Sequence, residues 1–396
     1  MPPFKRQITL DIAARLKSAK LPFMQVVLGP RQVGKTTGIW QAVQSLKMPY
    51  HFASADLPAP PDSVWIQTQW ETARALARKD KPFILILDEV QKIERWSEVV
   101  KQCWDEDRRT GSDIRPVVLG SSSLLLQKGL TESLAGRFEV SRFLHWTFKE
   151  CRKCFGWDID HYLYFGGYPG AATLAGDDLR WAEYVRDSLI ETAISKDILM
   201  LNAVDKPVLL RKLFVLGCEF PAQILSYQKV LGQLTDAGNT TTLANYQRLL
   251  QAAFLMAGLE KYSGSKIRQR SSSPKWLPLN TALVGALSFK SFEEAKKDGV
   301  FWGRLVECSI GAHLFNESAR AGAELFYWRE GNEEVDYVIK RGRQIAAIEV
   351  KTGSQMRKQS GLACFAKKFE PARLYVAGTG GIPVEKFLQL SMADFF

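Results

Sequence analysis

Short, unbroken apolar runs alternate with helix-length segments over the first third of the chain. The runs Met24–Leu28, Phe83–Leu87 and Pro116–Leu119 have the length of strands and no polar alternation, which is typical of parallel strands covered on both faces. Between them, Lys35–Leu46 and Trp65–Arg78 have the length of helices. The pattern predicts a doubly wound α/β domain on a parallel sheet.

After Glu150 the pattern becomes mainly helical. Helices are expected over Trp181–Leu201, Lys206–Cys218, Ser226–Leu234 and Thr242–Ala257. Thr241 or Thr242 is the expected cap of the last helix. Leu259–Tyr262 and Lys275–Leu279 would form the strands of a wing around the basic loop Ser263–Pro274. This order predicts a helix-turn-helix unit with a wing.

The last of these helices has two possible roles. Leu243, Leu250 and Phe254 fall near one face, and the polar residues on other faces are Asn245, Gln247, Arg248 and Gln251. Such a helix fits DNA recognition, with side chains directed at phosphates and base edges. It fits equally well a packing module that docks on the first domain or on another subunit.

The C-terminal part, from Phe301 to Val376, has the pattern helix, strand, strand, strand, helix, strand. The strands are expected over Glu324–Trp328, Val335–Lys340 and Gln344–Val350, with turns at Gly331-Asn332 and Arg341-Gly342. We therefore predict a doubly wound α/β domain over residues 1–150, a helical connector over 151–205, a winged-helix-like module over 206–280 and a second, smaller α/β domain over 281–396.

A phosphate-binding sequence follows the first apolar strand. Residues 29–36 fit GxxxxGK[ST], and they open a helix, as such a loop requires: Gly29, Pro30, Arg31, Gln32, Val33, Gly34, Lys35 and Thr36, followed by Thr37. Glycines let successive backbone N–H groups converge on phosphate oxygens, and the helix N-terminus adds partial positive charge. Lys35 would neutralise the β- and γ-phosphates of ATP, and the Thr36 hydroxyl would bind Mg²⁺.

Two acids end the second apolar strand. Asp88 and Glu89 follow Phe83–Leu87, and a buried strand end is a costly place for paired carboxylates unless a cation lies there. We expect Asp88 to hold Mg²⁺, directly or through water, and Glu89 to act as general base on the attacking water. The alternative is a pair of solvated acids that open a loop.

The third apolar strand ends in Gly120-Ser121-Ser122-Ser123, where a hydroxyl could contact the γ-phosphate. An ordinary run of helix-capping serines is the competing interpretation. Arg137 is a candidate arginine finger, acting in cis or in trans, or a surface residue.

A further cluster is expected in the C-terminal domain. Glu349 and Lys351 are two residues apart on one face of a strand, and Asp336 lies opposite them across the predicted hairpin. Glu307, on a helical face with Gly303 and Gly311, would point to the same place. Two carboxylates and a lysine can bind one or two Mg²⁺ ions and activate water. A salt-bridge cluster with Lys351 on Glu349 or Asp336 is the alternative.

Composition adds a possible polyanionic partner. The 396 residues carry a net charge of +11 and have a pI near 9.3, which favours nucleic acid without indicating any sequence specificity. Cys151 and Cys154 form a CxxC, which is half of a zinc site and therefore fits two incidental thiols better. Since no signal peptide or long apolar run is found, we expect a soluble, cytoplasmic protein that does not enter a membrane.

The ordered motifs resemble a known family. They resemble bacterial and archaeal AAA-type ATPases with the C-terminal domain of unknown function 4143, over nearly the whole chain: GPRQVGKTT at 29–37, LDEVQ at 87–91, LGSSSLLL at 119–126, ESLAGR at 132–137 and FGGYPGA at 165–171. The resemblance implies an AAA+-like P-loop domain in which Ser121 and Arg137 contact the γ-phosphate. It also implies that Gln91 couples the site to a partner and that the middle of the chain is winged-helix-like.

The C-terminal motif carries a second resemblance. Trp328-Arg329, Asp336 and Glu349-Val350-Lys351 resemble the PD-(D/E)xK restriction-endonuclease-like core. The family often has an acid near the stretch matched by Pro278–Asn280, where this chain has Asn280, so no role is assigned there.

Together these features predict a Mg-dependent ATPase whose nucleotide state is coupled to a C-terminal half that binds double-stranded DNA or another nucleic acid and is a candidate to cleave it. The alternative is a nucleotide-gated regulatory or scaffold protein, with a protein partner and an inert nuclease-like domain. Either protein could be an oligomer.

Overall fold

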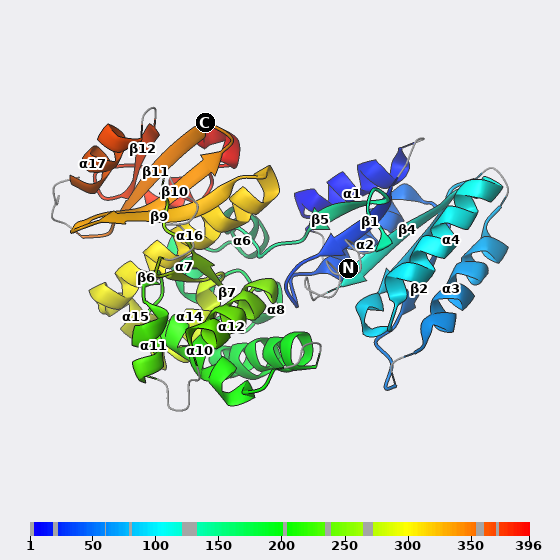
Figure 1. Cartoon of the computed structure of the whole chain (residues 1–396), viewed down its shortest axis with the longest axis horizontal. Coiled ribbons are helices and arrows are strands. Elements are labelled where there is room, and N and C mark those ends of the chain that lie inside the picture. Colours follow the sequence, from blue (N-terminus) through cyan, green and yellow to red (C-terminus); the bar gives the residue numbers. More distant parts are fainter. Residues whose placement is uncertain are drawn as a thin grey trace. The chain divides into compact units, whose positions relative to one another are not determined.

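The protein forms two compact units. The computed structural model describes residues 4–18, 23–59, 61–78, 81–120, 133–200, 204–233, 239–263, 272–353, 360–369 and 372–396. The first unit comprises Met1–Leu144 and Lys196–Asn202, and the second comprises His145–Ser195 and Ala203–Phe396 (Figure 1). The first unit thus ends a few residues before the predicted boundary at 150. The predicted boundaries at 205 and 280 stay predictions.

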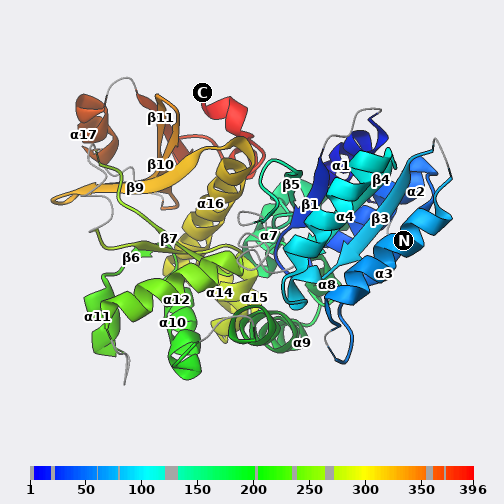
Figure 2. The same cartoon turned by 45° about the vertical axis from the view of Figure 1, so that its right-hand side comes forward.

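The first unit is a parallel five-stranded sheet with helices on both faces (Figure 2). The strand order is β2-β3-β4-β1-β5, and every neighbouring pair is parallel. This confirms the predicted doubly wound α/β class. Its elements are α1 (Gln7–Lys17), β1 (Met24–Leu28), α2 (Lys35–Leu46), β2 (Tyr50–Ser54), α3 (Ser63–Leu76), β3 (Phe83–Asp88), the 3₁₀ helix η1 (Val90–Lys92), α4 (Trp96–Thr110), β4 (Ile114–Gly120) and β5 (Phe138–Arg142).

The two edge strands were not predicted. β2 (YHFAS) and β5 (FEVSR) carry polar residues and are only partly buried, so neither has the apolar run that marks β1, β3 and β4. The central strands are buried because they have neighbours on both sides. On β3, the alternate residues Phe83, Leu85 and Leu87 pack into a core with α3 and α4.

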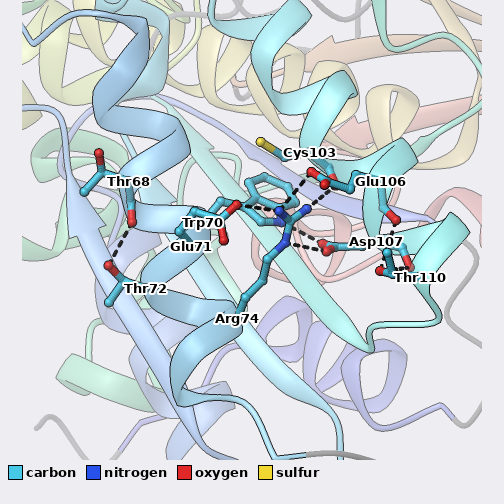
Figure 3. A network of polar contacts seen from close by, with 9 residues as sticks. All are labelled: Thr68, Trp70, Glu71, Thr72, Arg74, Cys103, Glu106, Asp107 and Thr110. Atoms are coloured by element: carbon cyan, nitrogen blue, oxygen red, sulfur yellow. Dashed lines mark hydrogen bonds and ion pairs between the residues drawn. The ribbon is translucent and has the colours of Figure 1, made fainter.

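A polar network with a buried aspartate at its centre joins α3 to α4 (Figure 3). The Arg74 guanidinium contacts three acids: Asp107 at 2.8 Å, Glu106 at 2.9 Å and Glu71 at 2.6 Å. The Trp70 indole N–H donates to the second Asp107 oxygen at 2.6 Å. Asp107 is only 1% exposed, so its charge depends on these partners.

The second unit begins with helical segments and contains two small sheets. Its elements up to the second sheet are α6 (Phe148–Phe155), α7 (Ile159–Phe165), α8 (Pro169–Ala172), α9 (Asp178–Glu183), the π-helical segments η2 (Tyr184–Glu191) and η3 (Ala193–Leu199), α10 (Pro207–Glu219), β6 (Gln223–Ile224), α11 (Tyr227–Gln233), α12 (Thr240–Ala252), β7 (Met256–Leu259), β8 (Lys275–Pro278), α14 (Thr281–Leu287) and α15 (Phe292–Lys297). The last η3 residues, from Lys196, pack with the first unit.

Helix α12 differs from the prediction at both ends. Asn239, rather than Thr241 or Thr242, is its cap, and the Asn239 side chain accepts from the Thr242 N–H at 2.9 Å. The helix ends at Ala252 instead of Ala257, because Phe254 has a left-handed φ of 59° and β7 begins at Met256. Strands β6, β8 and β7 form an antiparallel sheet beside α10, α11 and α12.

The last part of the chain has the predicted order of elements: α16 (Gly299–Ala321), β9 (Glu324–Glu330), β10 (Glu333–Arg341), β11 (Gln344–Lys351), α17 (Ser360–Lys368) and β12 (Ala372–Gly378), followed by α18 (Val384–Phe387) and the 3₁₀ helix η4 (Met392–Phe395). The sheet order is β12-β11-β10-β9, with β12 parallel to β11 and the other pairs antiparallel. Phe365 of α17 packs with Trp328 and Val338 in the core on one sheet face. No helix in the described ranges is long and apolar enough to span a membrane.

Candidate functional site

The loop between β1 and α2 has the geometry of a phosphate cradle. Gly34 has a φ of 87°, and a β-carbon on Gly29 would lie 1.9 Å from the Phe143 carbonyl oxygen, so both positions require glycine. Because the N-cap residue of α2 is Gly34, no side chain caps the first helical turn. The backbone N–H groups of Lys35, Thr36 and Thr37 therefore start the helix without an intrahelical acceptor, as an anion site requires.

The Lys35 ammonium lies against this loop. Its Nζ donates to the carbonyl oxygens of Gly29 at 3.0 Å and Pro30 at 2.8 Å. Within the described residues, Lys35 forms no ion pair. Burial lowers the pKa of Lys35 to about 8, against the attraction of Glu89 and Asp197. The loop thus holds a partly buried cation to which no acid of the described residues is directly bonded.

The carboxyl end of β3 brings Asp88 to the same site. The Thr36 hydroxyl donates to Asp88 Oδ2 at 3.4 Å, which joins the start of α2 to the end of β3. Burial, together with the charge of Glu89, raises the pKa of Asp88 to about 6. A hydroxyl and a carboxylate oxygen are ligands that Mg²⁺ prefers.

Glu89 is held by its backbone and by Gln91. Glu89 has a left-handed φ of 58°, and its N–H donates to the Leu119 carbonyl at 2.9 Å. The Gln91 side-chain amide donates to Glu89 Oε2 at 2.6 Å, while the buried Gln91 Oε1 atom accepts no hydrogen bond from the described residues. Gln91 therefore positions the Glu89 carboxylate. The predicted coupling of Gln91 to a partner stays a prediction.

These residues fit Mg–ATP. One side of the site carries uncapped amides and a partly buried ammonium, and the other carries adjacent acids at Asp88 and Glu89. Each side is electrostatically unfavourable alone, as the lowered pKa of Lys35 and the raised pKa of Asp88 indicate. A triphosphate would complement the first side and a divalent cation the second.

Arg31 has a partner that the sequence did not indicate. Its guanidinium makes two hydrogen bonds of 2.7 Å to the carboxylate of Asp197 on η3. The Asp197 side chain is 3% exposed. Burial alone lowers the pKa of Arg31, but Asp197 outweighs this effect and the net pKa is raised. Nothing in the sequence SKDILM around Asp197 marks it as a partner of a loop far away along the chain.

Arg137 lies away from the phosphate loop of its own chain. It precedes β5 at the amino end of β1, where its carbonyl accepts from the Met24 N–H at 2.8 Å. The phosphate loop follows the opposite end of this five-residue strand, roughly 13 Å away at about 3.3 Å per residue. Arg137 also forms a two-bond ion pair with Asp105. Whether Arg137 contacts a nucleotide, in cis or in trans, stays a prediction. Ser121 and the rest of 121–132 lie outside the described residues.

The predicted C-terminal cluster assembles around the β10–β11 hairpin. The last paired residues are Tyr337 and Ile348, so Asp336 and Glu349 follow as cross-strand neighbours. Asp336 Oδ2 accepts from the Val350 N–H at 2.7 Å. Lys351 forms an ion pair with Glu349, which is one of the pairings weighed against a metal site.

Lys275 also belongs to this cluster, although the sequence did not indicate it. Lys275 opens β8, and its Nζ lies 2.7 Å from Glu307 Oε1, 3.4 Å from Asp336 Oδ1 and 3.7 Å from Glu334 Oε1. Its side chain is 0% exposed. The available signal was a lysine next to the apolar residues Trp276 and Leu277 of a short strand, and its partners become evident only in the fold.

Two other predicted positions have structural partners. On α12, Gln247 is buried against Gly258 of β7 and bonds Gln251, so it is not part of an outward recognition face; Asn245 and Arg248 are exposed. Asn280 joins three segments of the second unit: its Oδ1 accepts from the N–H groups of Gly167 and Ala282, and its amide lies 3.1 Å from His145 Nδ1. Asn280 is thus a buried structural residue.

Three domain families match successive parts of the chain. Residues 22–152 match the AAA domain, 156–294 match a domain of unknown function (DUF8612), and 302–391 match a domain of unknown function (DUF4143). The chain therefore contains an AAA-type P-loop ATPase domain and a DUF4143 domain, which confirms this part of the resemblance. The match implies nucleotide binding by the first unit.

A relative and several solved structures are also similar. The "Uncharacterized protein MJ1544" of Methanocaldococcus jannaschii is 23% identical over 364 residues, which cover 84% of this chain and 75% of that protein. The Thermotoga maritima RuvB Holliday junction branch migration motor has a TM-score of 0.36 and 16% identity, over 64% of this chain and 90% of RuvB. Aeropyrum pernix Orc1 in complex with DNA has a TM-score of 0.31 and 13% identity, over 74% of this chain and 94% of Orc1.

Proposed function

We propose that the first unit binds Mg–ATP and hydrolyses it, and that its nucleotide state controls a second unit that binds nucleic acid. The observation that carries the ATPase proposal is the convergence of Lys35, Thr36 and Asp88 at an uncapped helix start, with Glu89 next to them. Glu89 fits the role of general base, because Gln91 holds one of its oxygens and fixes its orientation.

Each residue has a distinct part in this proposal. The N–H groups that start α2 and the Lys35 ammonium bind and orient the phosphates, and Thr36 and Asp88 would hold Mg²⁺. Bound Mg²⁺ would supply positive charge that stabilises the phosphates during transfer. Glu89 accepts a proton from the attacking water and needs its carboxylate ionised to do so.

Phosphate release by the purified full chain tests this proposal. We expect Mg-dependent turnover that is lost in Lys35→Ala and retained in Lys47→Ala, which removes an exposed lysine just after the other end of the same helix. Absence of turnover by the wild-type chain, with and without DNA or RNA, would refute the ATPase proposal.

The pair Arg31–Asp197 supports coupling between nucleotide and the second unit. Arg31 belongs to the phosphate loop, and Asp197 belongs to the short segment from Lys196 that is part of the first unit. The chain on both sides of that segment belongs to the second unit. A phosphate that competes for Arg31 would weaken its pair with Asp197 and so act on the segment that connects to the second unit.

Charge and element order support the nucleic-acid proposal. The net charge of +11 favours polyanions. The elements α10, β6, α11, α12, β7 and β8 have the order expected for a winged helix, and Arg248 and Asn245 of α12 are exposed. We expect affinity for double-stranded DNA to fall steeply from low to physiological salt. Affinity that does not change with salt would contradict this proposal.

A second candidate is a nucleotide-gated regulatory protein with a protein partner and an inert nuclease-like domain. The order of α16, β9, β10, β11, α17 and β12 supports a restriction-endonuclease-like core for that domain. Lys275 inside the acidic cluster favours a non-cleaving form of that core. Capture of a partner in only one nucleotide state, without DNA binding, would favour this candidate.

A further inference from the structure

The ammonium of Lys275 lies among the acids that sequence analysis assigned to metal binding. It is 2.7 Å from Glu307 on α16 and 3.4 Å from Asp336 on β10, and it also donates to the Asp336 carbonyl at 3.2 Å. The Tyr337 ring centroid lies 4.8 Å from Nζ, within the range of a cation–π contact. Lys275 comes from β8, so one buried cation joins the three-stranded sheet, the long helix and the four-stranded sheet.

The carboxylate oxygens that a metal would need are already in use. Glu307 Oε1 contacts Lys275, and Glu307 Oε2 accepts from Arg304 at 3.0 Å. Asp336 Oδ1 faces Lys275, and Asp336 Oδ2 accepts from the Val350 N–H. At Glu349, Oε1 pairs with Lys351. Among these three acids in the described chain, only the buried Glu349 Oε2 atom has no hydrogen-bond partner.

A divalent cation and this ammonium exclude each other. Mg²⁺ binds carboxylate oxygens at about 2.0–2.1 Å in a near-octahedral shell. An ion bound to Glu307 and Asp336 would lie within a few ångströms of Lys275 Nζ, where two buried cations repel strongly. In the described part of the chain, no group of three or more His, Cys, Asp or Glu side chains is arranged to hold a metal.

We infer that Lys275 supplies permanently the positive charge that a catalytic metal would supply, so that the cluster of Glu307, Asp336 and Glu349 binds no divalent cation and does not cleave nucleic acid. The cluster then acts as a structural junction within the second unit. The net effect of the acids raises the pKa of Lys275, against the lowering effect of burial, so Lys275 stays charged. This inference concerns the second unit and does not depend on ATP binding.

Counting bound Mn²⁺ by electron paramagnetic resonance tests the inference on the nucleotide-free full chain. An Asp88→Asn background removes the carboxylate of the phosphate site that would compete for Mn²⁺. In that background, adding Asp336→Asn should not change the number of Mn²⁺ ions bound per chain. Adding Lys275→Met should create one site per chain, and adding Asp336→Asn as well should remove it. Lys275→Arg, which keeps the positive charge, should create none.

Thermal denaturation gives a second readout. Lys275→Met leaves buried acids without their cation, so its melting temperature in EDTA should fall by roughly 10 °C, and Mn²⁺ should restore part of the loss. An Asp336-dependent Mn²⁺ site in the chain that retains Lys275 would overturn the inference, as would a folded Lys275→Met chain that gains no site. If Lys275→Met does not fold, the inference is tested by Mn²⁺ binding to chains that retain Lys275, compared with and without Asp336→Asn.

Discussion

Replacing Lys35 by methionine should stabilise the nucleotide-free protein while abolishing its response to ATP. Burial lowers the pKa of Lys35 from its ordinary 10.5 to about 8. At about 1.36 kcal/mol per pKa unit, the charged lysine destabilises the nucleotide-free fold by roughly 3 kcal/mol at neutral pH. Methionine has a similar length and no charge, so it removes this penalty.

The loss of two hydrogen bonds reduces this gain in the stability of Lys35→Met. Lys35 donates to the carbonyl oxygens of Gly29 and Pro30, and each bond contributes roughly 1 kcal/mol net. We therefore expect Lys35→Met to raise the free energy of unfolding by about 1 kcal/mol. Between about pH 8 and 10.5, Lys35 binds fewer protons in the folded wild type than in the unfolded chain, so the wild type becomes more stable as pH rises. The difference in free energy of unfolding between the wild type and Lys35→Met should therefore shrink over this range.

Urea denaturation of the full chain, followed with and without Mg–ATP, measures both effects. Mg–ATP at 100 times its Kd should stabilise the wild type by about 2.7 kcal/mol and leave Lys35→Met unchanged. Lys47→Met controls for loss of a lysine next to the same helix. A less stable Lys35→Met protein would refute the pKa reasoning, and an undiminished ATP effect would refute the role of Lys35 in phosphate binding.

Three further predictions follow from the first unit. Glu89→Gln should bind Mg–ATP as the wild type does and lose at least about 100-fold in turnover, measured by phosphate release; equal turnover would exclude Glu89 as the base. Mg–ATP affinity, measured by calorimetry across pH, should fall below about pH 6, where Asp88 takes up a proton, and above about pH 8, where Lys35 loses one; a flat profile would contradict both assignments. Arg74→Met should lower the free energy of unfolding by roughly 3 kcal/mol, because it leaves Asp107 buried without its cation, and a change near zero in urea denaturation would contradict this.

The sequence could predict features that depend on neighbouring residues along the chain. The phosphate loop was found because Gly29, Gly34 and Lys35 are close in sequence and follow an apolar strand. The acids Asp88 and Glu89 were found because a strand that is otherwise wholly apolar ends with them. Both signals are local, and parallel strands then bring their carboxyl ends to the same edge.

Features set by distant parts of the chain could not be predicted. The family resemblance implied a γ-phosphate contact for Arg137, and only the pairing of β5 with β1 reveals that Arg137 lies at the amino end of β1. Lys275 pairs with Glu307, 32 residues away in sequence, and Asp197 pairs with Arg31, 166 residues away. Such pairs arise from packing, and no periodicity of the chain encodes them.

The central claim is that the amides at the start of α2, Lys35 and Asp88 together enclose Mg–ATP. Titration calorimetry of the full chain with Mg–ATP and with ATP in EDTA tests this claim most directly. We predict one nucleotide bound per chain, no binding by Lys35→Met, and loss of the Mg²⁺ contribution to affinity in Asp88→Asn. Undetectable nucleotide binding by the wild-type chain, or equal binding by all three proteins, would contradict the account.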